Sequence, residues 1–296
     1  MAHKKKQVKD YRTELEKMAI QRYFNMTDGS QVRVLDFNFS QKPYEYTILL
    51  IPGFLTVFQS WQRVIELLTR EFRVLYFESR EKVTSKVPKK LERKITFPQM
   101  AYDIKEVVEQ LDLSDKKYIA LCSSTGGNIL TQALSNKLIS PTGAIMIGPA
   151  IEFHISGLVT FLSAITPNFM IQGVFIPLVR RYMTRVYINK KEEPEQLEKY
   201  IRALEEGNLR KALPTFRRMY RYKIWDQLPN VVTKTLLVGA SLDKMHATEE
   251  TLKAHNLMPN SLYIDLGSNK ETHSDPLVIE LKNFIEKLEK NSNNMK

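Results

Sequence analysis

The segment Ala120–Gly127 holds a serine at a position where a hydroxyl could act as a nucleophile. It reads ALCSSTGG, so a buried strand leads into a helix with almost no loop between them. A serine on such a sharp turn is presented for attack on a carbonyl carbon. The turn also brings the residues two before and two after the serine close to neighbouring backbone, so both must be small. Around Ser124 these residues are Cys122 and Gly126, which fit.

Ser123 is the other serine of this turn, but at the same spacing its neighbours are Leu121 and Thr125, which are larger. Sterics therefore favour Ser124 as the nucleophile. The alternative is an ordinary helix start in which a serine or threonine serves as the N-cap. We interpret Cys122 as a small buried residue rather than a nucleophile.

Two backbone N–H groups are predicted to stabilise the oxygen that becomes negative when a serine attacks a carbonyl. The helix that starts after Ser124 points its positive dipole end at that charge, which makes the Thr125 N–H one donor. The second donor should lie in a loop directly after a central strand. The sequence PGFL at 52–55 follows such an apolar run, and we assign the donor to the Phe54 N–H. The alternative for this loop is an ordinary Pro-Gly turn.

A serine hydroxyl needs a base at neutral pH, and histidine is the usual one. Of the five histidines, His273 follows the last predicted strand and precedes the last predicted helix. Asp243 comes just after the preceding strand, so the three residues follow one another along the chain in the order serine, acid, histidine. We expect His273 to take the proton of Ser124 and Asp243 to hold the imidazole in the correct tautomer.

The elements that must position these residues alternate between strands and helices. Strands are predicted at 31–37, 46–51, 72–77, 117–123, 144–147, 234–239 and 261–266. Helices are predicted at 58–70, 97–113, 126–137 and 275–290. This alternation predicts an α/β fold with a mostly parallel central sheet and helices on both faces. Every strand should then end on the same edge, where active sites of open sheets form.

The alternation stops between residues 151 and 229, which we interpret as a helical cap inserted between two parts of one core, 1–150 and 230–296. Residues 153–179 contain no Asp, Glu, Lys or Arg. Prolines interrupt this segment and the parts on either side of it form one sheet, so a membrane span is not expected. We expect the cap to line an apolar pocket for an acyl chain. Candidate lining residues are Phe153, Phe161, Val174, Phe175 and Ile176.

Across nearly its whole length the chain resembles the α/β-hydrolase superfamily. The segment ILLIPGFLTVFQSWQRVIELL is similar to the first strand–loop–helix unit of that family, and LCSSTGGNIL is similar to its nucleophile elbow. The segments DQLPNVVTKTLLVGASLD and THSDP are similar to its acid and histidine regions. The chain departs from the family pattern at Cys122, where glycine is more common, and at Pro52, where histidine is common.

The resemblance implies a serine esterase or lipase-like enzyme that cleaves carboxylic esters of apolar acyl substrates through an acyl-enzyme, with no metal and no cofactor. A thioesterase or acyltransferase with the same triad is an alternative, because the fold does not name the substrate. A non-catalytic protein of the same fold that binds a lipid or another small molecule is a further alternative.

The charge of the chain bears on its partners and its location. The formal net charge is +11, and the basic residues are spread along the chain without a recognised nucleic-acid motif, so nucleic acid is not expected as a partner. Three arginines directly follow the apolar segment, and peripheral contact with an anionic membrane stays open as a second role of the cap. A single cysteine and an N-terminus without an apolar run lead us to expect a cytoplasmic protein.

Overall fold

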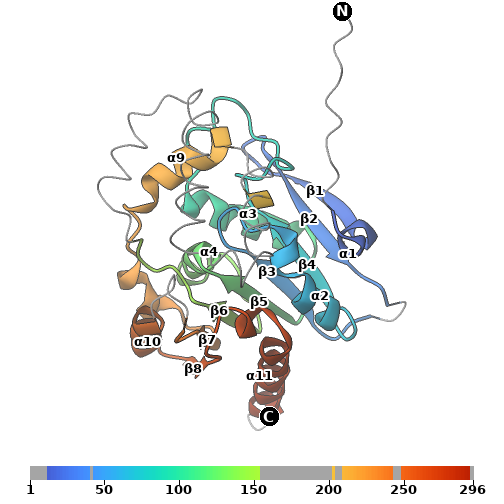
Figure 1. Ribbon diagram of the computed structural model, residues 1–296, viewed down its shortest axis with the longest axis vertical. Helices are drawn as coiled ribbons and strands as arrows, with labels where there is room; N and C mark the ends of the chain where they lie inside the picture. The colour runs from blue at the N-terminus through green and yellow to red at the C-terminus, as the bar shows by residue number, and fades with distance from the viewer. Residues whose placement is uncertain (1–11, 41–42, 154–201, 204–208, 243–247, 294–296) are drawn as a thin grey trace, which may run out of the picture.

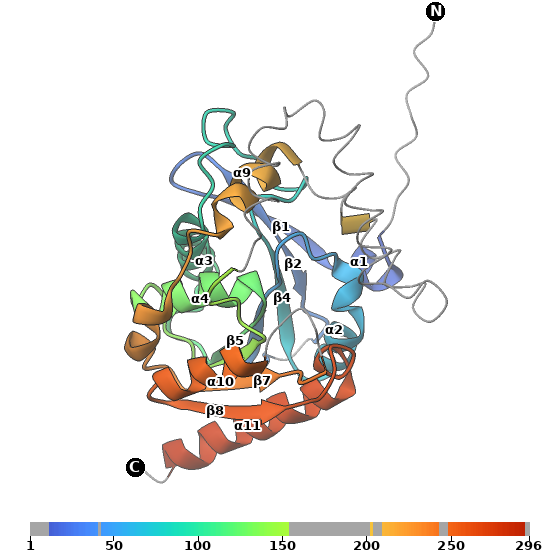
Figure 2. The ribbon, with the colours of Figure 1, turned by 60° about the vertical axis from the view of Figure 1, so that its left-hand side comes forward.

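The computed structural model describes residues 12–40, 43–153, 202–203, 209–242 and 248–293 of the chain. These parts form a central sheet with helices on both sides (Figures 1 and 2). Most of the predicted cap, including residues 154–201, lies outside the described residues. Its described part contains the helix α9 (Leu209–Met219) and the short 3-10 helix η3 (Trp225–Asn230). The division into core and cap therefore stays a prediction.

In the described part of the chain, eight strands form one sheet in the order β1-β2-β4-β3-β5-β6-β7-β8. The strands are β1 (Ile20–Asn25), β2 (Gln31–Phe37), β3 (Thr47–Ile51), β4 (Arg73–Glu78), β5 (Tyr118–Ser123), β6 (Gly143–Ile147), β7 (Thr235–Gly239) and β8 (Ser261–Asp265). Neighbouring strands from β4 to β8 all pair in parallel. The predicted α/β architecture with a mostly parallel sheet is confirmed.

The expectation that every strand ends on the same edge is wrong for β2, which pairs antiparallel with both β1 and β4. A parallel pair needs a long crossover connection, usually through a helix. Only a tight turn, in which Gly29 has a φ of 82°, joins β1 to β2. The edge strand β1 is itself an addition to the prediction, because most of its side chains are exposed and give no apolar pattern.

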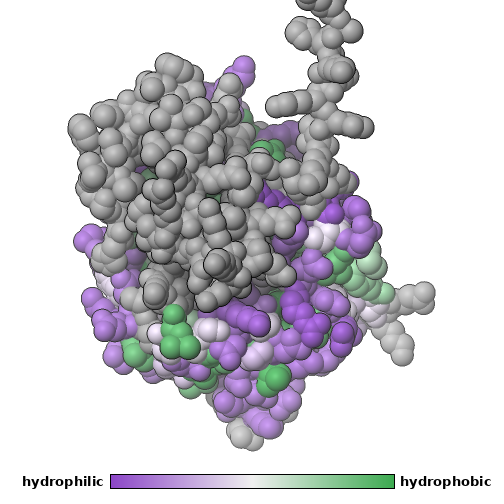
Figure 3. All heavy atoms as spheres, in the orientation of Figure 1, coloured by the Kyte–Doolittle hydropathy of each residue, from purple (hydrophilic) through white to green (hydrophobic). Residues whose placement is uncertain are grey.

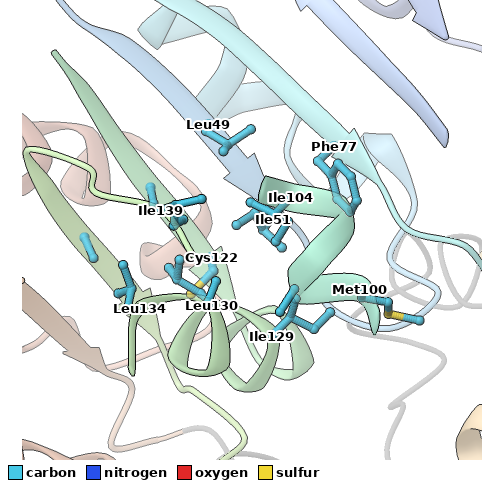
Figure 4. Close-up of a cluster of buried hydrophobic side chains, with 14 of the residues drawn as sticks. Leu49, Ile51, Phe77, Met100, Ile104, Cys122, Ile129, Leu130, Leu134 and Ile139 are labelled. Carbon is cyan, nitrogen blue, oxygen red and sulfur yellow. The ribbon is translucent and has the colours of Figure 1, made fainter. Parts of the chain in front are cut away.

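Each face of the sheet buries a separate apolar cluster, because successive side chains of a strand point to opposite faces. One cluster lies against α3 (Phe97–Gln110), α4 (Thr125–Ser135) and α10 (Thr248–Leu257). Figure 4 shows part of it, where Ile51 and Cys122 of the sheet lie near side chains of α3 and α4. The second cluster lies against α2 (Gln62–Leu68) and the C-terminal helix α11 (Asp275–Asn293). This double burial is why β3, apart from Thr47 at its start, is the unbroken apolar run ILLI.

The helix predicted at 58–70 is divided in the structure. A 3-10 turn, η1 (Phe58–Ser60), comes first and α2 follows only from Gln62. In the 3-10 turn the N–H of Trp61 donates to the Phe58 carbonyl at 2.8 Å. Side chains three apart are eclipsed in such a turn, so Phe58 and Trp61 are buried on the same side.

The surface of the described residues carries no large apolar face in the view of Figure 3. Side chains there are mainly hydrophilic, and the apolar ones lie in separate patches. Within the described ranges, no helix combines the length and the apolar character that crossing a bilayer requires.

Candidate active site

Ser124 lies at the junction of β5 and α4, with no loop residue besides itself. Its φ of 49° and ψ of −120° place a non-glycine residue in a sparsely populated backbone region. Hydrogen bonds on both sides hold this conformation: its N–H donates to the Ile147 carbonyl at 3.0 Å, and its carbonyl accepts from Gly127 and Ala150, each at 2.9 Å. The side chain is half-buried. The sequence thus places an accessible hydroxyl on a strained turn.

The close approach expected around this serine is observed at Gly126. A Cβ atom at that position would lie 2.3 Å from the Ile51 carbonyl oxygen and 3.0 Å from that of Pro52. The steric requirement for a small residue two positions after Ser124 is therefore confirmed. By contrast, Ser123 is a buried residue of β5 paired with Ile147 of β6, and cannot present its hydroxyl in the same way.

The thiol of Cys122, two residues before Ser124, is fully buried. Burial in apolar surroundings raises the pKa of the Cys122 thiol well above its ordinary value, because the thiolate would lose its hydration. A thiol that stays protonated is a poor nucleophile. This agrees with the interpretation of Cys122 as a core residue.

The predicted oxyanion loop is a four-residue turn, 53–56, packed against the serine. Its ends are joined by a hydrogen bond of 3.2 Å from the Thr56 N–H to the Gly53 carbonyl, and Leu55 has a φ of 54°. A Cβ atom at Gly53 would lie 3.3 Å from the Ser124 Cβ atom, so the turn contacts the elbow directly. We call residues 53–56 the oxyanion turn.

The two assigned donors lie at this edge of the sheet. Phe54 belongs to the oxyanion turn and Thr125 is the first residue of α4. Within the described ranges, neither the Phe54 N–H nor the Thr125 N–H donates to another protein group. Both N–H groups therefore fit the role predicted for them, and the N-terminus of α4 adds a positive dipole end.

His273 ends the short 3-10 helix η4 (Glu271–His273), between β8 and α11, and is half-buried. Its Nδ1 lies 3.0 Å from the Asn269 carbonyl oxygen and 3.0 Å from the Thr272 Oγ1. A proton on Nδ1 donated to Asn269 leaves Nε2 as the basic nitrogen, which is the nitrogen that a serine hydrolase uses. No hydrogen bond between the Ser124 hydroxyl and the His273 ring is present among the described residues.

The start of α2 connects the histidine to the oxyanion turn. The ring centroids of Trp61 and His273 are 4.6 Å apart, and the rings are tilted by 55°. Two positions later, Arg63 Nη2 forms an ion pair with Asp275 Oδ1 at 2.8 Å. Both contacts fasten the segment that carries His273 to the helix that follows the oxyanion turn. The predicted nucleophile, the predicted donors and the predicted base thus lie at one edge of the sheet.

The remaining predicted site residues are only partly described. Phe153 is half-buried, with its ring centroid 5.6 Å from that of Phe97, and packs on the core cluster of α3 and α4. Asp243 lies outside the described residues. So do four of the predicted pocket residues: Phe161, Val174, Phe175 and Ile176.

Sequence reasoning missed the polar residues that hold the segment after β4. Arg80 is buried, and its guanidinium contacts Asp103 of α3 and Asp28 of the β1–β2 turn, each at 2.5 Å. Lys82 is also buried, and its ammonium donates to the carbonyl of Thr56 in the oxyanion turn. The run ESREK at 78–82 is typical of a solvated loop, so nothing local predicts these contacts.

The sheet order, the strand–serine–helix junction and the histidine after the last strand define the α/β-hydrolase fold. The chain superposes on a thermophilic esterase from Thermogutta terrifontis with a TM-score of 0.72 and 18% identity, over 91% of this chain and 99% of that one. For the enol-lactonase from Burkholderia xenovorans LB400 the TM-score is 0.72 at 15% identity, over 90% and 100%. For an esterase from Exiguobacterium antarcticum the TM-score is 0.67 at 16% identity, over 92% and 99%. At these identities the likeness establishes the fold. No protein-family model and no curated protein sequence matches the chain.

Proposed function

We propose that the protein is a serine hydrolase that cleaves carboxylic esters of apolar acyl groups through an acyl-enzyme. The observation that carries the proposal is the backbone of Ser124, with a φ of 49° between a buried strand and a helix. A residue in such a region costs about 1–3 kcal/mol, and surroundings that enforce it are typical of functional sites. The surrounding hydrogen bonds enforce it here.

In the proposed reaction, the Ser124 oxygen attacks the ester carbonyl carbon while Nε2 of His273 takes the hydroxyl proton. The carbonyl oxygen becomes negative and accepts hydrogen bonds from the N–H groups of Phe54 and Thr125. The proton then passes from His273 to the leaving alcohol, and an acyl group remains on Ser124. Water repeats the sequence and releases the acid. Asp243 is proposed to orient His273 and stabilise the imidazolium.

The ester as substrate rests on two arguments. The structural neighbours include two esterases, which supports ester hydrolysis for a chain with the same fold. The apolar acyl group is inferred from residues 153–179, which lack charged side chains, and from the half-buried Phe54 of the oxyanion turn. A polar peptide would find few partners beside such residues.

A fluorophosphonate probe followed by peptide mapping tests the proposal, because the probe reacts with activated serines. We expect modification of Ser124 in the wild type, none in Ser124→Ala, and wild-type labelling in Ser123→Ala, which is the matched control. Folding of each variant is checked by circular dichroism. Absence of labelling in folded wild type would overturn the proposal in favour of a non-catalytic binding protein.

A further inference from the structure

Lys82 contacts the oxyanion turn at the residue that closes it. The side chain follows β4, is only 6% exposed, and donates from Nζ to the Thr56 carbonyl oxygen. The N–H of the same Thr56 donates to the Gly53 carbonyl and thereby closes the turn. The lysine thus holds one end of the short segment that carries the Phe54 N–H.

We propose that Lys82 is a positioning residue for the oxyanion hole, which fixes the turn 53–56 against Ser124 through the carbonyl of Thr56. This inference rests on the proposed function and names a residue that the serine hydrolase reaction itself does not require. The Tyr76 hydroxyl adds a weaker contact to the same carbonyl oxygen, at 3.4 Å.

The turn needs such an anchor because its own geometry is strained. Leu55 has a φ of 54°, which non-glycine residues rarely adopt, and only one backbone hydrogen bond closes the turn. An oxyanion donor is effective only when its position is fixed before the charge develops. A displacement of about 1 Å can reduce the rate about 100-fold. A charged donor on the closing residue restricts that displacement.

Lysine is otherwise a poor choice for this buried position. Its ammonium is strongly hydrated, and burying it is costly unless acceptors replace the water. A flexible side chain could instead extend to the solvent. The Lys82 ammonium is instead directed at the Thr56 carbonyl, which is one acceptor that replaces water.

A second buried lysine holds Lys82 in place. Lys211 of α9 is 1% exposed and donates from Nζ to the carbonyls of Lys82 and of Ser85, the latter at 2.7 Å. The Lys82 N–H donates in turn to the Ser79 carbonyl at 3.1 Å. A continuous series of contacts thus runs from α9 through Lys82 to the oxyanion turn.

The test compares Lys82→Met with Val108→Ala, a buried substitution in α3 that lowers stability without touching the turn. For Lys82→Met we expect kcat with a p-nitrophenyl ester to fall about 10- to 100-fold while KM changes less than about threefold, because the oxyanion exists only in the transition state. An alkylboronic acid, which forms a tetrahedral adduct, should lose affinity by the same factor as kcat/KM. The pKa of the acidic limb of the pH profile should not move. Val108→Ala should keep wild-type kcat.

The outcomes separate this inference from the proposed function. If the wild type neither hydrolyses esters nor reacts with a fluorophosphonate, the proposed function fails. If the wild type is active, and the Lys82→Met variant is folded and keeps the wild-type kcat and boronate affinity, the proposed role of Lys82 is wrong. Should Lys82→Met not fold, Tyr76→Phe removes the weaker donor and is expected to lower kcat about twofold to threefold. An unchanged kcat in that variant would then reject the inference.

Discussion

Substituting alanine for Gly126 would place a methyl carbon 2.3 Å from the Ile51 carbonyl oxygen. Cβ atoms do not approach other heavy atoms within 3.0 Å, so α4 and the end of β3 must separate by at least 0.7 Å. Neither β3 nor α4 can move easily. Ile51 pairs with Cys122 in the sheet, and the carbonyl of Ser124 accepts hydrogen bonds from the N–H groups of Gly127 and Ala150. The separation acts directly on the distance between the Ser124 oxygen and the oxyanion turn.

For Gly126→Ala we therefore expect kcat/KM to fall about 100-fold, the loss that a displacement approaching 1 Å produces in an active site. Overpacking should also lower the free energy of unfolding by about 1–3 kcal/mol. The assay is steady-state hydrolysis of a p-nitrophenyl ester, with unfolding followed in urea. Ser135→Ala, at the far end of the same helix, is the control and should keep wild-type kinetics. A fully active Gly126→Ala would refute the steric argument for Ser124 as the elbow serine.

Three further predictions use other parts of the molecule. Asp243→Asn should lower kcat by about 10⁴-fold with little change in KM, because a neutral amide cannot stabilise the His273 imidazolium as a carboxylate does. Ester hydrolysis measures this, and near-full activity would show that another carboxylate supports His273. In a panel of p-nitrophenyl esters of increasing acyl-chain length, kcat/KM should rise about three- to fourfold per added carbon until the pocket is full, since each buried CH₂ contributes about 0.8 kcal/mol. Phe175→Asp should flatten that rise. A flat wild-type profile would count against an acyl substrate. Burial lowers the pKa of Lys211 from 10.5 to about 8, so between these pH values the unfolded chain binds more protons than the folded one. The free energy of unfolding of the wild type, relative to that of Lys211→Met, should therefore increase by about 3 kcal/mol as pH rises from 8 toward 10.5. Urea unfolding at several pH values measures this, and a difference independent of pH would contradict it.

The sequence predicts the site best where a local pattern and a structural constraint coincide. The run YIALCS is buried on both faces of the sheet and leads into TGG without a loop, so the elbow can be located from eight residues. The steric comparison of Ser123 with Ser124 adds a constraint that the close approach of Gly126 to Ile51 confirms. The position of His273 after β8 follows in the same way, from element order alone.

Features that depend on long-range contacts or on exposed strands are not visible in the sequence. Strand β1 was missed because only Phe24 of its six residues is buried, and an edge strand with exposed side chains has no apolar period. The contact of Lys82 with Thr56 joins two segments separated by all of α2 and β4, and a charged run gives no sign of it. The same holds for the packing of Trp61 against His273.

The acyl-enzyme is the intermediate on which the whole mechanism depends, and rapid-quench mass spectrometry of the wild type with p-nitrophenyl butyrate detects it most directly. We expect a burst of p-nitrophenol equal to one per chain, with a butyryl group on the peptide that contains Ser124, and no burst in Ser124→Ala. A butyryl group carried by Ser123 or Cys122, or turnover without any acylated peptide, would contradict it.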